Sequence, residues 1–414
     1  MIKTLCSMIL SAFLLTGNPA YAGTTPEQDD QHTEKSELRA PVTILISIDG
    51  FRPDYLERGI TPNLSALAAS GVYGPMRPSF PSKTFPNHWT LVTGKTPDHH
   101  GIVGNTMEDS QRPGEVFRMA TKDPFWWSQA EPIWITAEKQ DVRTATMFWP
   151  GSEVDFNGIR PADWWPFNEK LSNDRRVNAV VDWMRRPADI RPKLVTLYFD
   201  TVDTAGHYHG PAPSEKLHAA ISAVDFEIGR LKQQLDALEQ PVNFVIASDH
   251  GMTETAPDRI IHLDKIMARD QYHMVEDGNY AGLEPLEGKE AALRAAFLRP
   301  HENMECWDRE NIPADFAYGK NARVPSILCL PKIGWVVYQD VPEWMTGIGG
   351  GHGYDHRAPD MMAFFLASGP AISAGDQLPV FDNVNVYSLV AKLAGIKPLA
   401  SDGSLAPFEP SLKP

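Results

Sequence analysis

Cysteine is scarce in this sequence, and the positions of the few cysteines limit what they can do. The 414 residues contain three cysteines, of which Cys6 lies near the start and Cys306 and Cys329 lie far downstream. This pattern does not offer a metal site built on cysteine ligands. The two downstream residues could form a disulfide or remain separate buried thiols, because sequence separation does not fix the distance between two Cα atoms.

Long hydrophobic runs are also lacking. The apolar run at residues 8–15 falls well short of the ~20 residues that a membrane-spanning helix needs. Lys3 precedes this run and a small-x-small site, Ala20-Tyr21-Ala22, follows it, so we expect a signal peptide over residues 1–22. The sequence therefore predicts no membrane span and a periplasmic or secreted location, where a disulfide is favoured.

Basic residues are fewer than acidic residues in this sequence. The chain has 38 Lys and Arg against 53 Asp and Glu, which gives a formal net charge of -15. Such a surface repels polyanions, so a long nucleic acid is not expected as a partner. Small phosphorylated molecules remain possible substrates, because bound metal ions reverse the local field of an acidic site. The sequence also has no internal repeat and no low-complexity tract.

Apolar runs of strand length alternate with helical patterns. Strands are predicted at residues 42–48, 194–199, 242–247 and 361–367, and helices at residues 61–71 and 214–238. In the first helix, Thr61 is expected as the N-cap, followed by a proline in the first turn. This alternation predicts an α/β fold with a mostly parallel central sheet and helices on both faces. In such sheets, ligands gather beyond the carboxyl ends of the strands.

The domain organisation follows from composition. Residues 23–40 are polar and charged, which is typical of a flexible leader. Residues 41–414 are expected to form a single catalytic domain. Within it, residues from about 252 to 350 have weak periodicity and scattered Pro, Gly and Trp, so we expect an inserted subdomain that borders the site.

Six potential metal ligands lie where a parallel sheet would gather them. They are Asp49 after the first predicted strand, Asp203 and His207 after the second, Asp249 and His250 after the third, and His352 in a glycine-rich stretch. Each pattern alone is more typical of a cap, a surface turn or an ordinary loop. Three carboxylates with three imidazoles suit zinc, and six ligands are too many for one tetrahedral ion. The set predicts two Zn²⁺ ions, an arrangement that supports in-line displacement at phosphorus.

Thr84 is the candidate nucleophile. It lies in a turn, residues 81–88, that opens a predicted helix carrying Trp89 to Thr93. The unpaired N–H groups and the positive dipole end of a helix start stabilise an alkoxide and an anionic substrate. On local sequence alone, Thr84 is better explained as the N-cap residue. The accompanying metal ligands favour the nucleophile.

With these motifs, the sequence resembles the nucleotide pyrophosphatase/phosphodiesterase family of the alkaline phosphatase superfamily. The matching stretches occur in order at residues 46–55, 83–88, 100–105, 197–207, 249–252 and 352–355. The resemblance implies an alkaline-phosphatase-like fold with two zinc ions. It assigns one zinc to Asp203, His207 and His352, and the other to Asp49, Asp249, His250 and the Thr84 oxygen.

The resemblance also implies roles around the nucleophile. Asn105 would bind a phosphoryl oxygen, and Phe85 and Tyr198 would sandwich a nucleobase. Trp165, with its neighbours Trp164 and Phe167, would complete that wall or belong to the core. The substrate would be a small nucleotide or phosphodiester, cleaved through a phosphorylated Thr84 to release a nucleoside 5'-monophosphate.

Other functions remain open at this stage. The same zinc core serves phosphomonoesterases, phosphonate hydrolases and lysophospholipase-C-type diesterases. A non-catalytic periplasmic binding protein is the distant alternative, although Thr84 would be superfluous there. The sequence lacks the cysteine-rich N-terminal modules and the calcium-loop motif of animal members, and it leaves open the oligomeric state and the preference between diester and pyrophosphate bonds.

Overall fold

The computed structural model describes residues 39–343, 345–375 and 377–413. The predicted signal peptide, residues 1–22, lies outside the described residues, as does the predicted leader apart from Arg39 and Ala40. Across the described part of the chain, the helices are all too short or too polar to cross a membrane.

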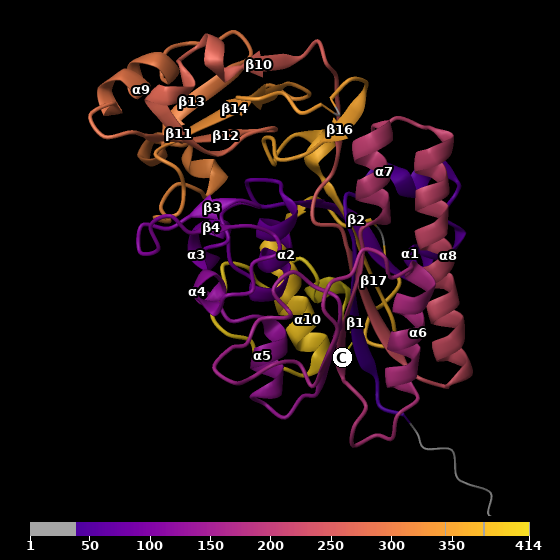
Figure 1. The fold of residues 1–414 in the computed structure, drawn as a ribbon. Coiled ribbons are helices and arrows are strands. Elements are labelled where there is room, and N and C mark those ends of the chain that lie inside the picture. Colours follow the sequence, from indigo (N-terminus) through magenta and orange to yellow (C-terminus); the bar gives the residue numbers. More distant parts are fainter. Residues whose placement is uncertain (1–38, 344, 376, 414) are drawn as a thin grey trace, which may run out of the picture. The chain divides into compact units, whose positions relative to one another are not determined.

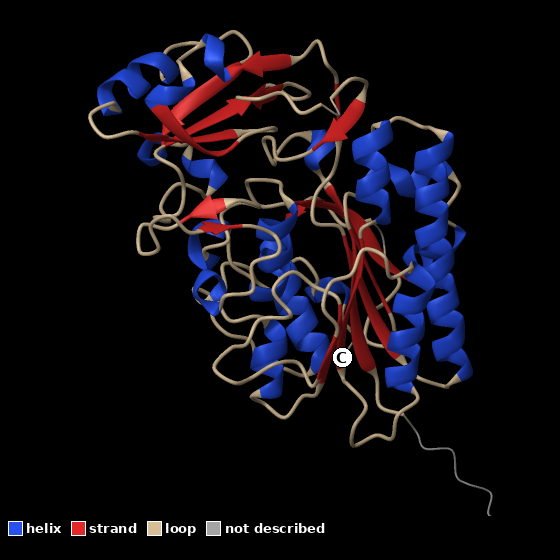
Figure 2. Cartoon of the chain, in the orientation of Figure 1, coloured by secondary structure: helices blue, strands red, loops and turns tan. Residues whose placement is uncertain are grey.

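An eight-stranded sheet forms the centre of the structure (Figure 1; Figure 2). In spatial order its strands are β18 (Phe381–Asp382), β2 (Gly71–Arg77), β17 (Ala363–Ser368), β8 (Val242–Ala247), β1 (Val42–Ile48), β7 (Leu194–Phe199), β5 (Thr144–Met147) and β6 (Asp163–Trp164). β17 is antiparallel to both of its neighbours, and the other pairs are parallel. The mostly parallel sheet predicted from the sequence is confirmed. β1 lies between β7 and β8, so the three strands that precede predicted ligands are adjacent.

The predicted strands are the ones with unbroken apolar runs. Every residue of β1, β7 and β8 is buried, as a parallel sheet covered on both faces requires. The fourth predicted strand corresponds to β17, which begins two residues later than expected, at Ala363. β2 and β5 were not predicted, because β2 contains two glycines and a proline and β5 has only four residues.

Helices cover both faces of the sheet (Figure 1). α1 (Pro62–Ala69), α6 (Asn173–Met184) and α8 (Glu215–Ala237) pack on one face, and α2 (Thr84–Thr93), α5 (Ile133–Glu138) and α10 (Val386–Ala394) pack on the other. Along β1, Ile44 and Ile46 contribute to the first core and Leu45 to the second, because successive side chains of a strand point to opposite faces. Each such fully buried side chain stabilises the fold by about 1.5–3 kcal/mol.

The start of α1 departs from the sequence prediction. Thr61 was expected to cap this helix, but its side chain makes no cap hydrogen bond. Asp225 of α8 takes that role instead, because its carboxylate accepts hydrogen bonds from the N–H groups of Asn63 at 3.2 Å and Leu64 at 2.8 Å. A residue far away in sequence thus satisfies the helix start, which local patterns cannot reveal.

A second, antiparallel sheet lies between β8 and β17 in sequence. Its strands, in spatial order, are β11 (Tyr272–Glu276), β12 (Ala281–Pro285), β14 (Ile327–Pro331) and β13 (Met304–Asp308), and α9 (Glu290–Phe297) packs on them. Cys306 and Cys329 are opposite each other on β13 and β14 and form a disulfide. The structure therefore selects the disulfide over the two separate thiols.

The remaining α-helices and strands are short. They are α3 (Pro97–His100), α4 (Pro124–Trp127), α7 (Thr201–His209), β3 (Met107–Glu108), β4 (Val116–Phe117), β9 (Thr253–Thr255), β10 (Ile260–His262), β15 (Val336–Tyr338) and β16 (Gly349–Gly351). β3 pairs with β4, β9 with β16, and β10 with β15.

Candidate active site

The candidate site lies at the carboxyl edge of the central sheet. Asp49 follows β1, Asp249 and His250 follow β8, and α7, which carries Asp203 and His207, follows β7. Because β1, β7 and β8 are adjacent and parallel, their ends meet at one place.

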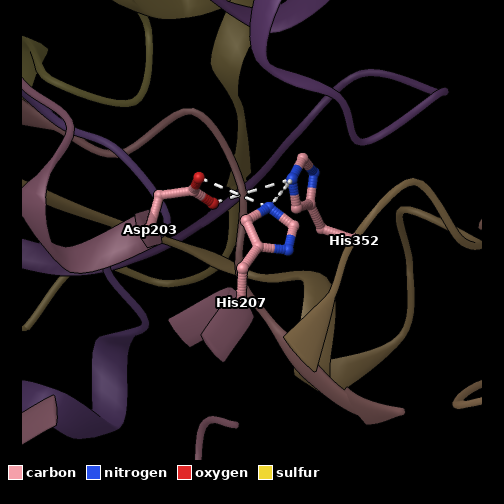
Figure 3. A group of neighbouring side chains, drawn as sticks. All are labelled: Asp203, His207 and His352. Atoms are coloured by element: carbon pink, nitrogen blue, oxygen red, sulfur yellow. Dashed lines mark hydrogen bonds and ion pairs between the residues drawn. The ribbon is translucent and has the colours of Figure 1, made fainter. Parts of the chain in front are cut away.

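Asp203, His207 and His352 form one compact group (Figure 3). His207 Nε2 lies 3.4 Å from Asp203 Oδ2 and 3.2 Å from His352 Nε2, and His352 Nε2 lies 3.6 Å from Asp203 Oδ1. The other ring nitrogens contact carbonyl oxygens, since His207 Nδ1 is 2.9 Å from Gly350 O and His352 Nδ1 is 2.9 Å from Ser82 O. These carbonyls favour the tautomer with a proton on Nδ1, which leaves both Nε2 atoms free as metal ligands.

The glycine-rich stretch brings His352 to this group. A Cβ atom added at Gly349 would lie 2.6 Å from the His207 carbonyl oxygen, and one added at Gly350 would lie 2.4 Å from the Gly206 carbonyl oxygen. Larger residues would push β16 away from α7. The backbones of β16 and α7 are closely packed here, and this packing lets His352 approach Asp203 and His207.

A second group surrounds Thr84. His250 Nε2 lies 2.9 Å from Asp249 Oδ2, 3.3 Å from Asp49 Oδ1 and 3.3 Å from Thr84 Oγ1. Its ring also stacks on that of His352, with 3.5 Å between the ring centroids. The two groups are therefore contiguous, as two metal ions with a shared substrate would require.

Unpartnered carboxylate oxygens show that these groups fit cations. Asp49 Oδ1, Asp203 Oδ1 and Asp249 Oδ2 are buried without a hydrogen-bond donor. Burial, together with repulsion from Asp249 and Asp203, raises the pKa of Asp49 well above its usual value. Buried charges of this kind need a compensating ion or proton, and the mixed oxygen and nitrogen donors are those that zinc accepts.

Thr84 is the first residue of α2. Lys83 occupies the N-cap position, with no side-chain capping bond, so the alternative in which Thr84 is the N-cap is wrong. The Thr84 hydroxyl instead faces His250. The helix start thus presents the hydroxyl and the free N–H groups of the first turn to the same space.

Asn105 lies beside this helix start. Its Oδ1 accepts a hydrogen bond from the Phe85 N–H group at 3.0 Å. Because that bond uses the amide oxygen, the Nδ2 group of Asn105 remains available as a donor to a ligand.

A cavity of about 520 Å³ opens beside Thr84. Phe85 and Phe167 are among its lining residues, whereas Trp165 is not among them and is 47% exposed. The structure therefore does not bring Trp165 to the cavity wall. Phe167, which the sequence placed in the same cluster, lines it instead.

Tyr198 lies deeper than expected for a stacking residue. It reaches the cavity lining but is only 8% exposed, and its hydroxyl donates a 2.6 Å hydrogen bond to Asp49 Oδ2. Its ring also contacts that of Phe167, with centroids 5.9 Å apart. Tyr198 thus supports both the wall and a carboxylate of the candidate metal-binding groups.

Sequence reasoning missed His88. Its Nδ1 lies 2.8 Å from the Thr84 carbonyl oxygen and 3.3 Å from Asp249 Oδ2, and its Nε2 lies 2.7 Å from Ser47 Oγ. His88 also forms a possible metal-binding group with Asp49 and Asp249. The available signal was its spacing of four residues from Thr84, which places both on one helix face.

A mostly parallel sheet with paired carboxylate and imidazole groups at its carboxyl edge defines a hydrolase with the alkaline-phosphatase-like α/β fold. The model of the type I phosphodiesterase / nucleotide pyrophosphatase family matches residues 43–355. The chain belongs to this family and is a nucleotide pyrophosphatase/phosphodiesterase, as the sequence resemblance indicated.

Relatives extend this match over most of the chain. An uncharacterized pyrophosphatase/phosphodiesterase of Schizosaccharomyces pombe is 35% identical and covers 87% of this chain and 78% of its own length. The bis(5'-adenosyl)-triphosphatase of Xenopus laevis is also 35% identical, and its match covers 88% of this chain and 80% of its own length. The structure of murine ectonucleotide pyrophosphatase/phosphodiesterase 5, an inactive threonine-to-alanine variant in complex with AMP, matches with a TM-score of 0.86 and 31% identity, covering 90% of this chain and all of that one.

Proposed function

We propose that this protein is a two-zinc hydrolase that cleaves phosphodiester or pyrophosphate bonds of nucleotides and releases a nucleoside 5'-monophosphate. One observation carries the proposal. The Thr84 hydroxyl, 3.3 Å from His250 Nε2, lies between the metal-ligand groups and the aromatic cavity. A phosphate bound at the ligands would therefore have a nucleoside-sized space beside it.

Three features support a nucleotide substrate. Phe85 and Phe167 offer apolar rings to a base, and base–aromatic stacking stabilises a complex by about 1–3 kcal/mol per base. Relatives are named for bis(5'-adenosyl)-triphosphate cleavage, and a related structure contains AMP. The cavity volume of about 520 Å³ is in the range of small-molecule sites.

The first step would be attack by Thr84. Its hydroxyl loses a proton to solvent, and the Oγ1 atom forms a bond to phosphorus while the bond from phosphorus to the leaving oxygen breaks in line. The free Nδ2 group of Asn105 and the N–H groups at the start of α2 would hold the non-bridging phosphoryl oxygens. The leaving group takes its proton from water.

The second step would hydrolyse the phosphorylated Thr84. Water forms the new bond to phosphorus, the bond to Thr84 Oγ1 breaks, and Thr84 regains its proton. The nucleoside monophosphate then leaves the aromatic cavity. The inactive variant of the murine relative, in which alanine replaces a threonine, agrees with a catalytic threonine.

Two zinc ions would be held by the residues already described. Asp203, His207 and His352 form one set, and Asp49, Asp249, His250 and Thr84 form the other. Zinc supplies Lewis-acid chemistry, which makes a bound hydroxyl more acidic and offsets negative charge on the reacting oxygens.

Hydrolysis of thymidine 5'-monophosphate p-nitrophenyl ester, compared with p-nitrophenyl phosphate, tests the reaction class. We expect a higher kcat/KM on the diester. A Thr84→Ala variant should retain zinc and lose diester turnover. Faster cleavage of the monoester would favour the phosphomonoesterase alternative, and full turnover by Thr84→Ala would exclude the nucleophile. Lysophosphatidylcholine is the substrate that tests the lipid alternative.

Export is a separate part of the proposal. The signal-peptide pattern at residues 1–22 predicts that the mature chain begins at Gly23. The Cys306–Cys329 disulfide supports an oxidising compartment. Mass spectrometry of the purified protein would show a mass that lacks the first 22 residues.

A further inference from the structure

The loop that carries Asn105, residues 101–106, is held by two residues of the segment between β13 and β14. The Tyr318 hydroxyl donates a 2.8 Å hydrogen bond to the Val103 carbonyl oxygen. Arg323 donates to the Gly101 carbonyl oxygen at 2.8 Å. This segment of the chain therefore fixes the beginning of the Asn105 loop.

The end of the same loop is fixed as well. Arg323 forms a buried ion pair with Asp109, in which Nε lies 2.7 Å from Oδ2. His273 of β11 lies 2.7 Å from the Glu108 carboxylate. Breaking a buried ion pair is costly, because one charge is left without its partner.

Glu276, the last residue of β11, lies against the centre of the loop. Its carboxylate accepts a hydrogen bond from the Tyr280 hydroxyl, and the backbone N–H group of Thr106 stabilises its charged form. Burial raises the pKa of Glu276, and the positive charge of Lys83, with the Tyr280 hydroxyl and the Thr106 N–H group, opposes that rise. The carboxylate thus contacts the residue immediately after Asn105.

Gly104 brings the same carboxylate against the residue before Asn105. A Cβ atom at Gly104 would lie 2.8 Å from Glu276 Oε2 and 2.9 Å from the Tyr280 hydroxyl oxygen. Real Cβ contacts are almost never this short, so the backbone approaches Glu276 as closely as only glycine allows. Glu276 therefore contacts the chain on both sides of Asn105.

Asn105, which lies between the two residues that Glu276 contacts, is close to Thr84. Its Oδ1 is fixed by the Phe85 N–H group, one residue from Thr84. We propose that Glu276 is a positioning residue, which holds the backbone of Gly104 and Thr106 so that the Asn105 amide meets a phosphoryl oxygen. This inference rests on the proposed function, because it assigns Glu276 a role in that reaction.

The expected effect follows from the precision that such a donor requires. A donor to a developing oxyanion acts at 2.7–3.1 Å from the oxygen. A mutation outside the reacting groups that misplaces such a donor by about 1 Å can lower the rate by roughly 100-fold. Without the Glu276 carboxylate, the backbone on both sides of Asn105 loses a supporting contact, and the bond from the Phe85 N–H group must hold the Asn105 amide without it. The loss should appear in kcat, since Asn105 acts on charge that develops in the transition state.

A double-mutant cycle separates positioning from a general structural role. For Glu276→Ala we expect kcat on the thymidine nitrophenyl diester to fall about 10- to 100-fold, with KM and zinc content little changed. In an Asn105→Ala background, Glu276→Ala should cause no further fall, because the residue that it positions is already absent. Independent, multiplying losses would overturn the inference, and so would an unchanged kcat in Glu276→Ala.

Glu284 provides a matched control. It lies on β12 of the same sheet, and its carboxylate accepts the Ser326 N–H group at 2.9 Å and also the Ser326 hydroxyl. Glu284→Ala therefore removes a carboxylate of the same sheet whose hydrogen bonds go to Ser326 and not to the Asn105 loop, and kcat should remain at the wild-type value. A fall equal to that of Glu276→Ala would show a general effect of the sheet and would overturn the inference.

Two further variants keep the test decisive. If Glu276→Ala does not fold, Glu276→Gln retains the shape and one acceptor, and Tyr280→Phe removes only the hydroxyl that bonds to Glu276. Both should lower kcat less than Asn105→Ala and show the same dependence on Asn105; additive losses in both would overturn the inference. Failure of the proposed function would look different, because the wild-type protein would then not cleave the diester.

Discussion

The Tyr198 hydroxyl donates a 2.6 Å hydrogen bond to Asp49 Oδ2, while Asp49 Oδ1 is buried without a donor. One oxygen of the carboxylate is therefore held by the protein, and the other faces the candidate metal site. Partners of this kind orient ligands, and their loss typically costs 10- to 100-fold in metal affinity or activity. For Tyr198→Phe we expect a roughly tenfold loss of zinc affinity and kcat, with KM maintained by the remaining ring.

Chelator competition and steady-state kinetics check this prediction. Tyr55→Phe is the matched control, because the Tyr55 hydroxyl is buried without a hydrogen-bond partner. That variant should retain wild-type zinc affinity. If Tyr198 served only as a wall for the base, Tyr198→Phe would bind zinc and turn over substrate like the wild type.

Phe167 is the second target. It is 49% exposed, lines the cavity and contacts the rings of Phe148 and Tyr198. Phe167→Ala should raise KM for a nucleotide diester by an amount that corresponds to about 1–3 kcal/mol, with kcat little changed. Trp165→Ala is the control, because Trp165 lies outside the cavity lining. Equal increases in KM for the two variants would show that Phe167 does not contact the base.

Metal removal should affect stability as well as activity. A ligand that binds only the folded state adds about 4 kcal/mol to the free energy of unfolding when it is present at 1,000 times its Kd. Dialysis against a chelator should abolish diester cleavage and lower Tm, and added Zn²⁺ should restore both. The stabilisation by Zn²⁺ should be reduced in Asp203→Asn and unchanged in Asp182→Asn, whose carboxylate is on the surface. An equal response of both variants would contradict the assigned ligands.

The burial of His100, which lies outside the candidate metal-binding groups, predicts that the fold loses stability in acid. Burial lowers the pKa of His100 to about 3, and its Nδ1 accepts a hydrogen bond from the Ile102 N–H group at 3.1 Å. The unfolded state, with a pKa near 6.5, therefore binds more protons, and the free energy of unfolding decreases as pH falls from about 6.5 to about 3. The contribution of one such group is about 1.4 kcal/mol per pH unit within this window and vanishes above it.

Denaturant unfolding at several pH values measures that slope. His100→Gln should lower stability at neutral pH but reduce the slope below pH 6.5 by about one proton. An unchanged slope in His100→Gln would show that other groups cause the acid sensitivity.

The parts of the fold that could be predicted are those with strong local patterns. β1, β7 and β8 are unbroken apolar runs, and each precedes an acidic residue, so both the strands and the edge where their ends meet could be read from the sequence. β2 could not, because its glycines and proline are accommodated only by pairing with β17 and β18. The cap that Asp225 provides for α1 likewise depends on packing between distant segments.

In the candidate site, too, the features that depend on tertiary packing could not be predicted from the sequence. Residue types and spacing indicated the carboxylates and imidazoles, because metal ligation restricts the possible residues. The roles of aromatic residues were harder to predict, since Tyr198 and Phe167 differ in depth rather than in chemistry. Whether a ring faces a ligand or supports a carboxylate depends on the tertiary structure, and the role proposed for Glu276 depends on a contact between β11 and a loop distant in sequence.

The position of β2 in the central sheet has a consequence for how the enzyme matures. β2 precedes the helix with Thr84, yet it pairs only with β17 and β18, which are formed by residues almost 300 positions later. Contacts of such long range form late and slow the folding of a chain. During synthesis, β2 therefore has no partner strand until residues 363–382 have been made. The helix that carries Thr84 follows β2 directly, so this side of the sheet is completed only when nearly the whole polypeptide is present.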